Sequence, residues 1–174
     1  MTTTEPNPRL LNYLIWLGAA GFIVILAFSA ALDPSIRLLH LFQALMYVAV
    51  IVLTARARRW GLFLGVSVAA FWNYSAMFVN SFFHNGMDAL TQSFAHDRIV
   101  HPDQIIAVVA VFLHLVMIAG CLAAYLRLSR KSWTDLAAWA ATLVGQGCYF
   151  AAIMALFQPR YLSLFPRLLH PHGL

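Results

Sequence analysis

Charged residues are scarce in this chain, and they are confined to short segments. Lys and Arg contribute 11 of the 174 residues and Asp and Glu only 6, so that 10% of the chain is charged, whereas soluble domains average about 25%. Long polar stretches are also missing, because the longest, 84–103, has only 20 residues, too few to bury a core of its own. A separate soluble domain is therefore excluded, and we expect residues 1–174 to form one membrane domain.

Cysteine and several catalytic motifs are scarce or missing as well. Cys121 and Cys148 lie inside apolar stretches and form no CxxC pair, which excludes a thiolate metal cluster and a disulfide-exchange motif. The sequence has no GxSxG motif, no phosphate-binding glycine loop and no paired intramembrane aspartates. It also has no charged residue deep in an apolar stretch, where a proton relay would need one. Intramembrane proteases, nucleotide-driven pumps and proton-coupled transporters are therefore disfavoured.

Hydrophobic residues dominate the chain instead, at 62%, and all seven prolines lie outside the interiors of the apolar stretches. A hydrocarbon core of about 30 Å requires about 20 residues of helix, and a helix satisfies its own backbone hydrogen bonds in lipid. We therefore predict an all-α integral membrane protein in which helices 2–5 form a bundle and the first packs on its side. The five predicted transmembrane helices are 12–32, 38–55, 61–82, 104–126 and 133–157.

Small residues in the fifth stretch suggest how the bundle packs. Ala137, Ala141 and Gly145 recur at four-residue spacing, and small residues on one helix face allow a neighbouring helix to approach closely. We therefore expect the fifth helix to be central. Between the third and fourth stretches, Met87 and Phe94 lie on one side of a predicted short amphipathic helix, which we expect on the outer membrane surface.

Basic residues are sorted to one side of the predicted membrane. Seven of the eleven lie before the first stretch or in the turns after the second and fourth. The positive-inside rule makes this side cytoplasmic, which predicts a multi-pass inner (plasma) membrane protein with its N-terminus inside and its C-terminus outside. Because topology explains these charges, they give no reason to expect nucleic-acid binding. The seven are Arg9, Arg56, Arg58, Arg59, Arg127, Arg130 and Lys131.

Four polar residues from four different helices are predicted to share one layer in the outer half of the bundle: His40, Asn73, His114 and Gln146. Their depth follows from a rise of about 1.5 Å per helical residue, and polar groups at that depth should face the bundle interior. One interpretation is interhelical hydrogen bonding. Another is a ligand site, because two histidines on different helices are the minimum for a b-type haem. A quinone or another apolar ligand is a further candidate.

The outer side carries most of the remaining imidazole and carboxylate groups. Imidazole and carboxylate suit a divalent transition metal such as zinc, iron or copper, although the spacing matches no established zinc motif. A solvated polar loop is the alternative. If a metal is bound, we expect His84, Asp88, His101 and Asp103 as its ligands, with Asp88 also a candidate catalytic base.

One segment of the fifth stretch has a familiar pattern. Val144-Gly145-Gln146 followed by Tyr149-Phe150, together with five predicted spans, resembles the emopamil-binding and sigma-2 receptor membrane fold. This resemblance covers one helix. The acidic residues that those proteins place in their ligand cavity have no evident counterpart here, so sterol chemistry is not carried over.

These patterns favour a ligand-binding, cofactor-binding or electron-transfer membrane subunit, because the polar layer has suitable residues and no pair of nucleophile and base is evident. Two alternatives stay open. One is a metal-assisted enzyme acting on a lipid or isoprenoid at the outer face. The other is a structural subunit that contacts other membrane subunits or a second copy of this chain.

Overall fold

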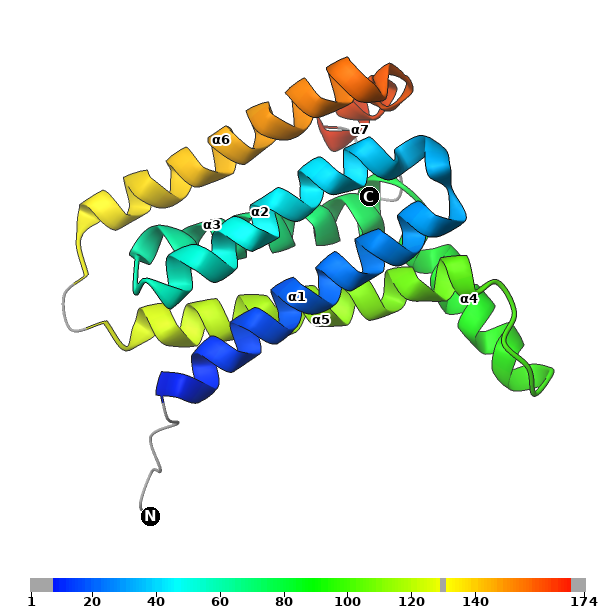
Figure 1. Cartoon of the computed structure of the whole chain (residues 1–174), viewed down its shortest axis with the longest axis horizontal. Helices are drawn as coiled ribbons and strands as arrows, with labels where there is room; N and C mark the ends of the chain where they lie inside the picture. The colour runs from blue at the N-terminus through cyan, green and yellow to red at the C-terminus, as the bar shows by residue number, and fades with distance from the viewer. Residues whose placement is uncertain (1–7, 129–130, 170–174) are drawn as a thin grey trace, which may run out of the picture.

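The computed structural model describes residues 8–128 and 131–169, and all regular structure within these ranges is helical (Figure 1). Five helices are long and apolar enough to span a membrane, which confirms the predicted all-α membrane fold, and α4 provides the short helix between the third and fourth spans. The helices are α1 (Pro8–Leu32), α2 (Arg37–Ala55), α3 (Arg59–Tyr74), α4 (Phe82–Ala95), α5 (Pro102–Leu126), α6 (Trp133–Phe157) and α7 (Phe165–Leu169). Three shorter turns of helix are η1 (Pro34–Ile36), the π-helical η2 (Ser75–Val79) and η3 (Pro159–Leu164).

The first helix lies along one side of the bundle, as predicted, with one face buried and the other exposed at Tyr13, Leu17 and Val24. It packs against α5 and α2, and Ile15, Ala19 and Phe22 are buried. Gly18 makes the approach to α5 close, because a Cβ atom there would lie 2.6 Å from the carbonyl oxygen of Leu113. Gly18 of α1, together with Gly120 of α5, which lies against Ile15, therefore allows the two helices to approach closely.

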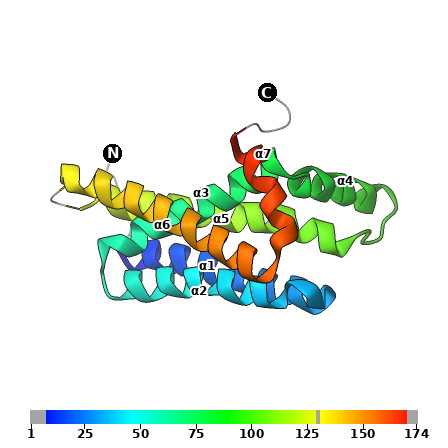
Figure 2. The same ribbon diagram turned by 90° about the horizontal axis from the view of Figure 1, so that it is seen from above.

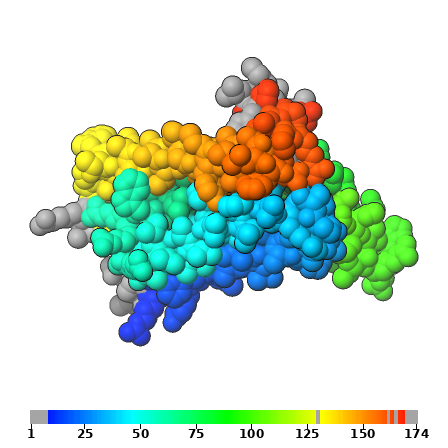
Figure 3. Space-filling view, turned by 45° about the horizontal axis from the view of Figure 1, so that its top comes forward, coloured from blue at the N-terminus to red at the C-terminus, as the bar shows by residue number. Residues whose placement is uncertain are grey.

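The last transmembrane helix, α6, lies at an edge of the bundle and packs mainly on α3 (Figures 1 and 3). Ala137, Ala141 and Gly145 are exposed, and a Cβ atom built on Gly145 meets nothing within 4 Å. The prediction that α6 is central is therefore wrong. Hydrogen bonds to α3 decide which face turns inward, since Asp135 and Gln146, which bond to that helix, lie on the buried face.

Residues 56–58, 127–128 and 131–132 lie at the end of the bundle where α1 begins (Figure 1), which we call the basic end. Its arrangement is held in part by Trp16 near the start of α1, whose indole N–H donates to the Thr54 hydroxyl at 3.0 Å. The opposite end carries α4 and the C-terminal segment, which turns back across the bundle (Figure 2). There the Tyr74 hydroxyl donates to the Leu168 carbonyl at 2.9 Å.

Candidate functional site

His114, one of the predicted layer residues, is enclosed at the centre of the bundle. Its side chain is fully buried, and its Nε2 atom lies 2.8 Å from the Tyr47 hydroxyl on α2. Its ring centroid is 4.2 Å from that of Phe22 and 4.8 Å from that of Trp72. Three aromatic rings from α1, α2 and α3 therefore surround the imidazole and occupy the space beside it.

His40 does not join His114, although both were predicted in one layer. The His40 Nδ1 atom lies 3.1 Å from the Leu26 carbonyl oxygen, and no hydrogen bond or ring contact links the two imidazoles. On α2 it is Tyr47, two turns further along, that reaches His114. A bis-imidazole haem needs both rings directed at one iron. The packing around His114 therefore gives the haem hypothesis no support.

Asn73 and Gln146 are buried, at 7% and 1% exposure, and each leaves its side-chain oxygen without a partner. The Gln146 amide nitrogen donates to the Ser67 carbonyl at 3.0 Å. A third unpartnered amide oxygen belongs to Gln43 on α2, which our sequence analysis missed although it lies only one turn before Tyr47. The Gln146 amide thus connects α6 to α3, whereas the side-chain oxygens of Gln43, Asn73 and Gln146 are buried without a hydrogen-bond partner.

The contact between Tyr47 and His114 predicts a measurable contribution to stability. We expect Tyr47→Phe to lower the free energy of unfolding by about 1 kcal/mol, because it leaves the buried Nε2 atom of His114 without a partner. Reversible unfolding in mixed micelles measures this difference. The matched control is Tyr13→Phe, since the Tyr13 side chain is 60% exposed. Equal effects of the two substitutions would show that the hydrogen bond contributes nothing.

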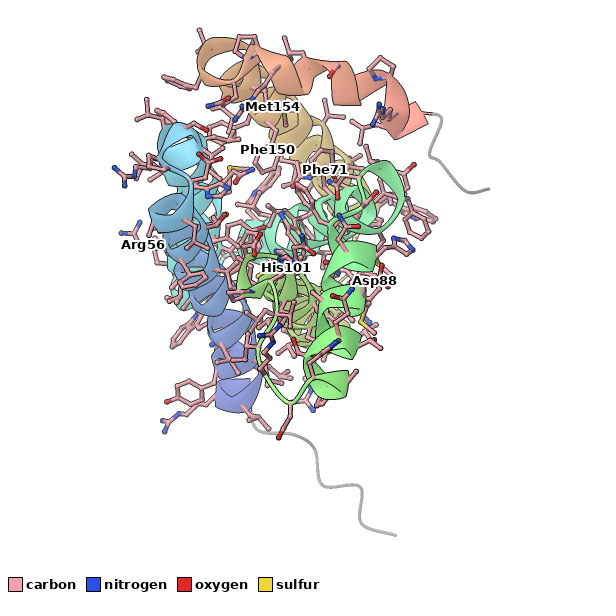
Figure 4. All side chains as sticks on the ribbon, turned by 90° about the vertical axis from the view of Figure 1, so that its right-hand side faces the viewer. Arg56, Phe71, Asp88, His101, Phe150 and Met154 are labelled. Carbon is pink, nitrogen blue, oxygen red and sulfur yellow. The ribbon has the colours of Figure 1, made fainter. Side chains whose placement is uncertain are left out.

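The four predicted metal ligands lie at the other end of the molecule and are all exposed. His84 and Asp88 belong to α4, whereas His101 precedes the first residue of α5 (Figure 4). Within residues 8–128 and 131–169, no three His, Cys, Asp or Glu side chains lie close enough to hold a metal ion. The structure therefore gives no support to a metal site built from His84, Asp88, His101 and Asp103.

A cleft of about 630 Å³ opens instead at the basic end, between α5 and α6. It exists because α6 packs on α3 rather than on α5, so that α3 forms the floor and the other two helices form the walls. Leu122 and Leu136, one on each wall, are 45% and 56% exposed, which leaves the cleft open at its side. Its apolar lining includes Leu62, Phe63, Val66, Leu122, Leu136 and Trp139.

The end of this cleft is polar and centres on Asp135, the only buried carboxylate of the described residues. Its Oδ1 atom accepts a hydrogen bond from Arg59 on α3 at 3.2 Å. Its Oδ2 atom accepts from the Ser132 backbone N–H at 3.0 Å and from the Tyr125 hydroxyl of α5 at 3.2 Å. Lys131 lies nearby, with its Nζ atom 5.9 Å from the centroid of the Tyr125 ring.

Local sequence explains why Asp135 takes this position. Ser132 and Asp135 form a capping box at the start of α6. In a capping box, the side chain of each of the two residues accepts a hydrogen bond from the backbone N–H of the other. The Ser132 hydroxyl accepts from the Thr134 N–H at 3.3 Å. The Ser-x-x-Asp pattern was a readable signal for a helix start, but its proximity to Arg59 and Tyr125 depends on the packing of three helices.

No protein-family model, curated protein or solved structure matches this chain. The residues of the cleft themselves indicate what it can bind. Apolar walls bind hydrocarbon, and charged or hydrogen-bonding groups at one end orient a polar head. This combination suits an amphipathic molecule, which places its head among Arg59, Tyr125 and Lys131 and its hydrocarbon part along α3.

Proposed function

We propose that this protein is a membrane-embedded binding protein for an amphipathic small molecule, with the cleft between α5 and α6 as its binding site. The observation that carries the proposal is the junction of an apolar cleft with the polar group of Arg59, Asp135, Tyr125 and Lys131. The proposal keeps the ligand-binding class that the sequence favours. It moves the site from the central polar layer to the basic end.

The size and shape of the cleft support a small amphipathic ligand. Its volume of about 630 Å³ lies within the range of about 300–1,000 Å³ that is usual for small-molecule sites. From the N-cap Ser132 to Trp139 the lining follows the start of α6 over eight residues, or about 10 Å for seven steps of 1.5 Å. The exposed side between Leu122 and Leu136 allows hydrocarbon to enter from the bilayer without passing through water.

The electron-transfer and metal-dependent alternatives lack a comparable assembly of described residues. His40 and His114 have separate partners, and the outer histidines are dispersed. If the basic end is cytoplasmic, as the charge distribution predicts, the ligand enters from the inner leaflet of the membrane. In this orientation the binding site lies on the cytoplasmic side of the membrane. The ligand residues that the sequence predicted lie on the outer side instead.

Photolabelling of the full chain in lipid nanodiscs tests the binding site. The probe is a phospholipid with a photoactivatable diazirine in its acyl chain, and mass spectrometry maps the labelled peptides. We expect labelling to concentrate on α3, α5 and α6 near Val66 and Leu122. Leu122→Trp should fill the cleft and reduce this labelling about tenfold, which corresponds to about 1.4 kcal/mol of lost binding.

The matched control for the filling substitution is Leu115→Trp. Leu115 lies two turns before Leu122 on α5, has a similar exposure of 49% and does not line the cleft. We expect this variant to label like the wild type. Labelling spread evenly over exposed positions of all helices, such as Val24 of α1, would show that the probe reports only bulk lipid and would refute the proposal.

A further inference from the structure

We propose, building on the proposed function, that the ligand is an acidic phospholipid of the surrounding bilayer and that its phosphate binds Arg59 by displacing the Asp135 carboxylate. Asp135 then acts as an internal competitor for the head group. The proposal rests on the charge balance of the basic end, the partners that Asp135 has besides Arg59, and the position of Arg59 beside the cleft.

The basic end has a strong excess of positive charge around the cleft. Among the described residues of the two turns and the adjoining starts of α3 and α6, five side chains are cationic and only Asp135 is anionic. Lys131 lines the cleft and has no carboxylate partner among the described residues. An acidic lipid head is attracted to such a surface, by about 1 kcal/mol for each Lys or Arg near the membrane. The five are Arg56, Arg58, Arg59, Arg127 and Lys131.

Arg59 can change partner without disturbing the start of α6. It bonds to both oxygens of Asp135, at 3.2 Å and 3.3 Å, and Oδ2 also receives the Ser132 N–H and the Tyr125 hydroxyl. Displacement of the guanidinium therefore leaves the capping box and the link to α5 in place. The Arg59 side chain is also 39% exposed, so part of its guanidinium is open to an approaching anion.

The chemistry of the guanidinium and the phosphate favours the exchange of Asp135 for a lipid head group. A guanidinium presents its N–H donors as a planar fork that matches the oxygens of a phosphate, and charge-assisted bidentate pairs are stronger than neutral hydrogen bonds. The head group would lie between Arg59 and Lys131, and its acyl chain would follow the apolar lining toward Val66 and Trp139. A zwitterionic phospholipid with the same chains binds less tightly, because the cation of its own head group repels Lys131.

The substitution Asp135→Asn distinguishes two roles of Asp135: competition with the phosphate for Arg59, and an ion pair that only stabilises the fold. An asparagine retains one carbonyl oxygen for the Ser132 N–H and the Tyr125 hydroxyl, but it removes the negative charge and leaves its amide group facing Arg59. The guanidinium is then free for phosphate. We therefore expect Asp135→Asn to bind an acidic lipid more tightly than the wild type does, whereas a purely structural pair predicts weaker binding of every lipid.

The experiment uses the full chain in phosphatidylcholine nanodiscs with two diazirine probes that have identical acyl chains, phosphatidic acid and phosphatidylcholine. For the wild type we expect about tenfold stronger labelling of the cleft by the acidic probe, weakening at high salt because screening shortens the reach of the charges. Arg59→Gln and Lys131→Gln should reduce this preference, and Asp135→Asn should increase it about threefold or more. Arg56→Gln is the control for lost surface charge, since Arg56 is exposed and lies outside the cleft.

The outcomes separate this inference from the proposed function. Equal labelling of the cleft by both probes would overturn the inference and leave the binding site in place. Weaker labelling of Asp135→Asn by both probes would also overturn it. Labelling of the cleft by neither probe would refute the proposed function itself. If Asp135→Asn does not fold, Lys131→Gln decides the question, because Lys131 is exposed and an unchanged preference in that variant contradicts head-group binding.

Discussion

Gly18→Leu is expected to lower the free energy of unfolding by about 3 kcal/mol or more, because overpacking a tight contact forces backbone shifts. A single Cβ atom at this position would lie 2.6 Å from the Leu113 carbonyl oxygen and 2.7 Å from Cβ of Met117. Neither atom belongs to the flexible end of a side chain. The leucine must therefore push α1 away from α5, and thermal unfolding followed by tryptophan fluorescence measures the loss.

Gly145→Leu is the matched control for this substitution. Gly145 lies in the middle of α6, and a Cβ atom there meets nothing within 4 Å, so we expect a change within about 0.5 kcal/mol. The difference in stability between the two variants compares the packing of α1 with that of α6. If Gly145→Leu were the more damaging substitution, the tight packing of α1 on α5 and the peripheral position of α6 would both be contradicted.

Phe22→Ala is expected to lower the free energy of unfolding by about 2–3 kcal/mol through loss of packing. Phe22 is 1% exposed, and its ring contacts the rings of Tyr47, Trp72 and His114. This loss of unfolding free energy is smaller than is usual in soluble proteins, because lipid chains solvate an apolar side chain as well as the protein interior does. What is lost is the close packing of the aromatic cluster.

The control for Phe22→Ala is Phe28→Ala on the same helix, since Phe28 is 44% exposed. Unfolding in mixed micelles compares the two variants, and we expect the control to lie within about 0.5 kcal/mol of the wild type. The near-ultraviolet circular dichroism of Phe22→Ala should also weaken, because the ring no longer orders its aromatic neighbours. Similar losses of stability in both variants would show that Phe22 has no special place in the core.

The sequence could predict that polar residues face the bundle interior, but not which groups they meet there. His114, Asn73 and Gln146 are buried as expected, because polar groups avoid lipid. His40 meets the Leu26 carbonyl instead of His114. Which ring of α2 reaches His114 depends on the rotation of that helix, and a sequence of mostly apolar residues does not specify it.

The same physical reason explains why the central position predicted for α6 was wrong. In water, an apolar face must be buried, so its position in the sequence reveals the core. In lipid, an apolar face is stable on either side, and packing is decided by small contacts and by hydrogen bonds between helices. Gly18 against Leu113 brings α1 close to α5, and the hydrogen bond of Gln146 to Ser67 turns α6 onto α3.

The sequence by itself determined that this is a five-span helical membrane protein, because the hydrophobic length and the need for backbone hydrogen bonds are local properties of each segment. It also predicted the separation of basic residues into two turns. Only the tertiary structure decided the candidate site. Arg59, Tyr125 and Asp135 come from three different helices, and they meet beside an apolar cleft because α6 rests on α3 and leaves the face of α5 open.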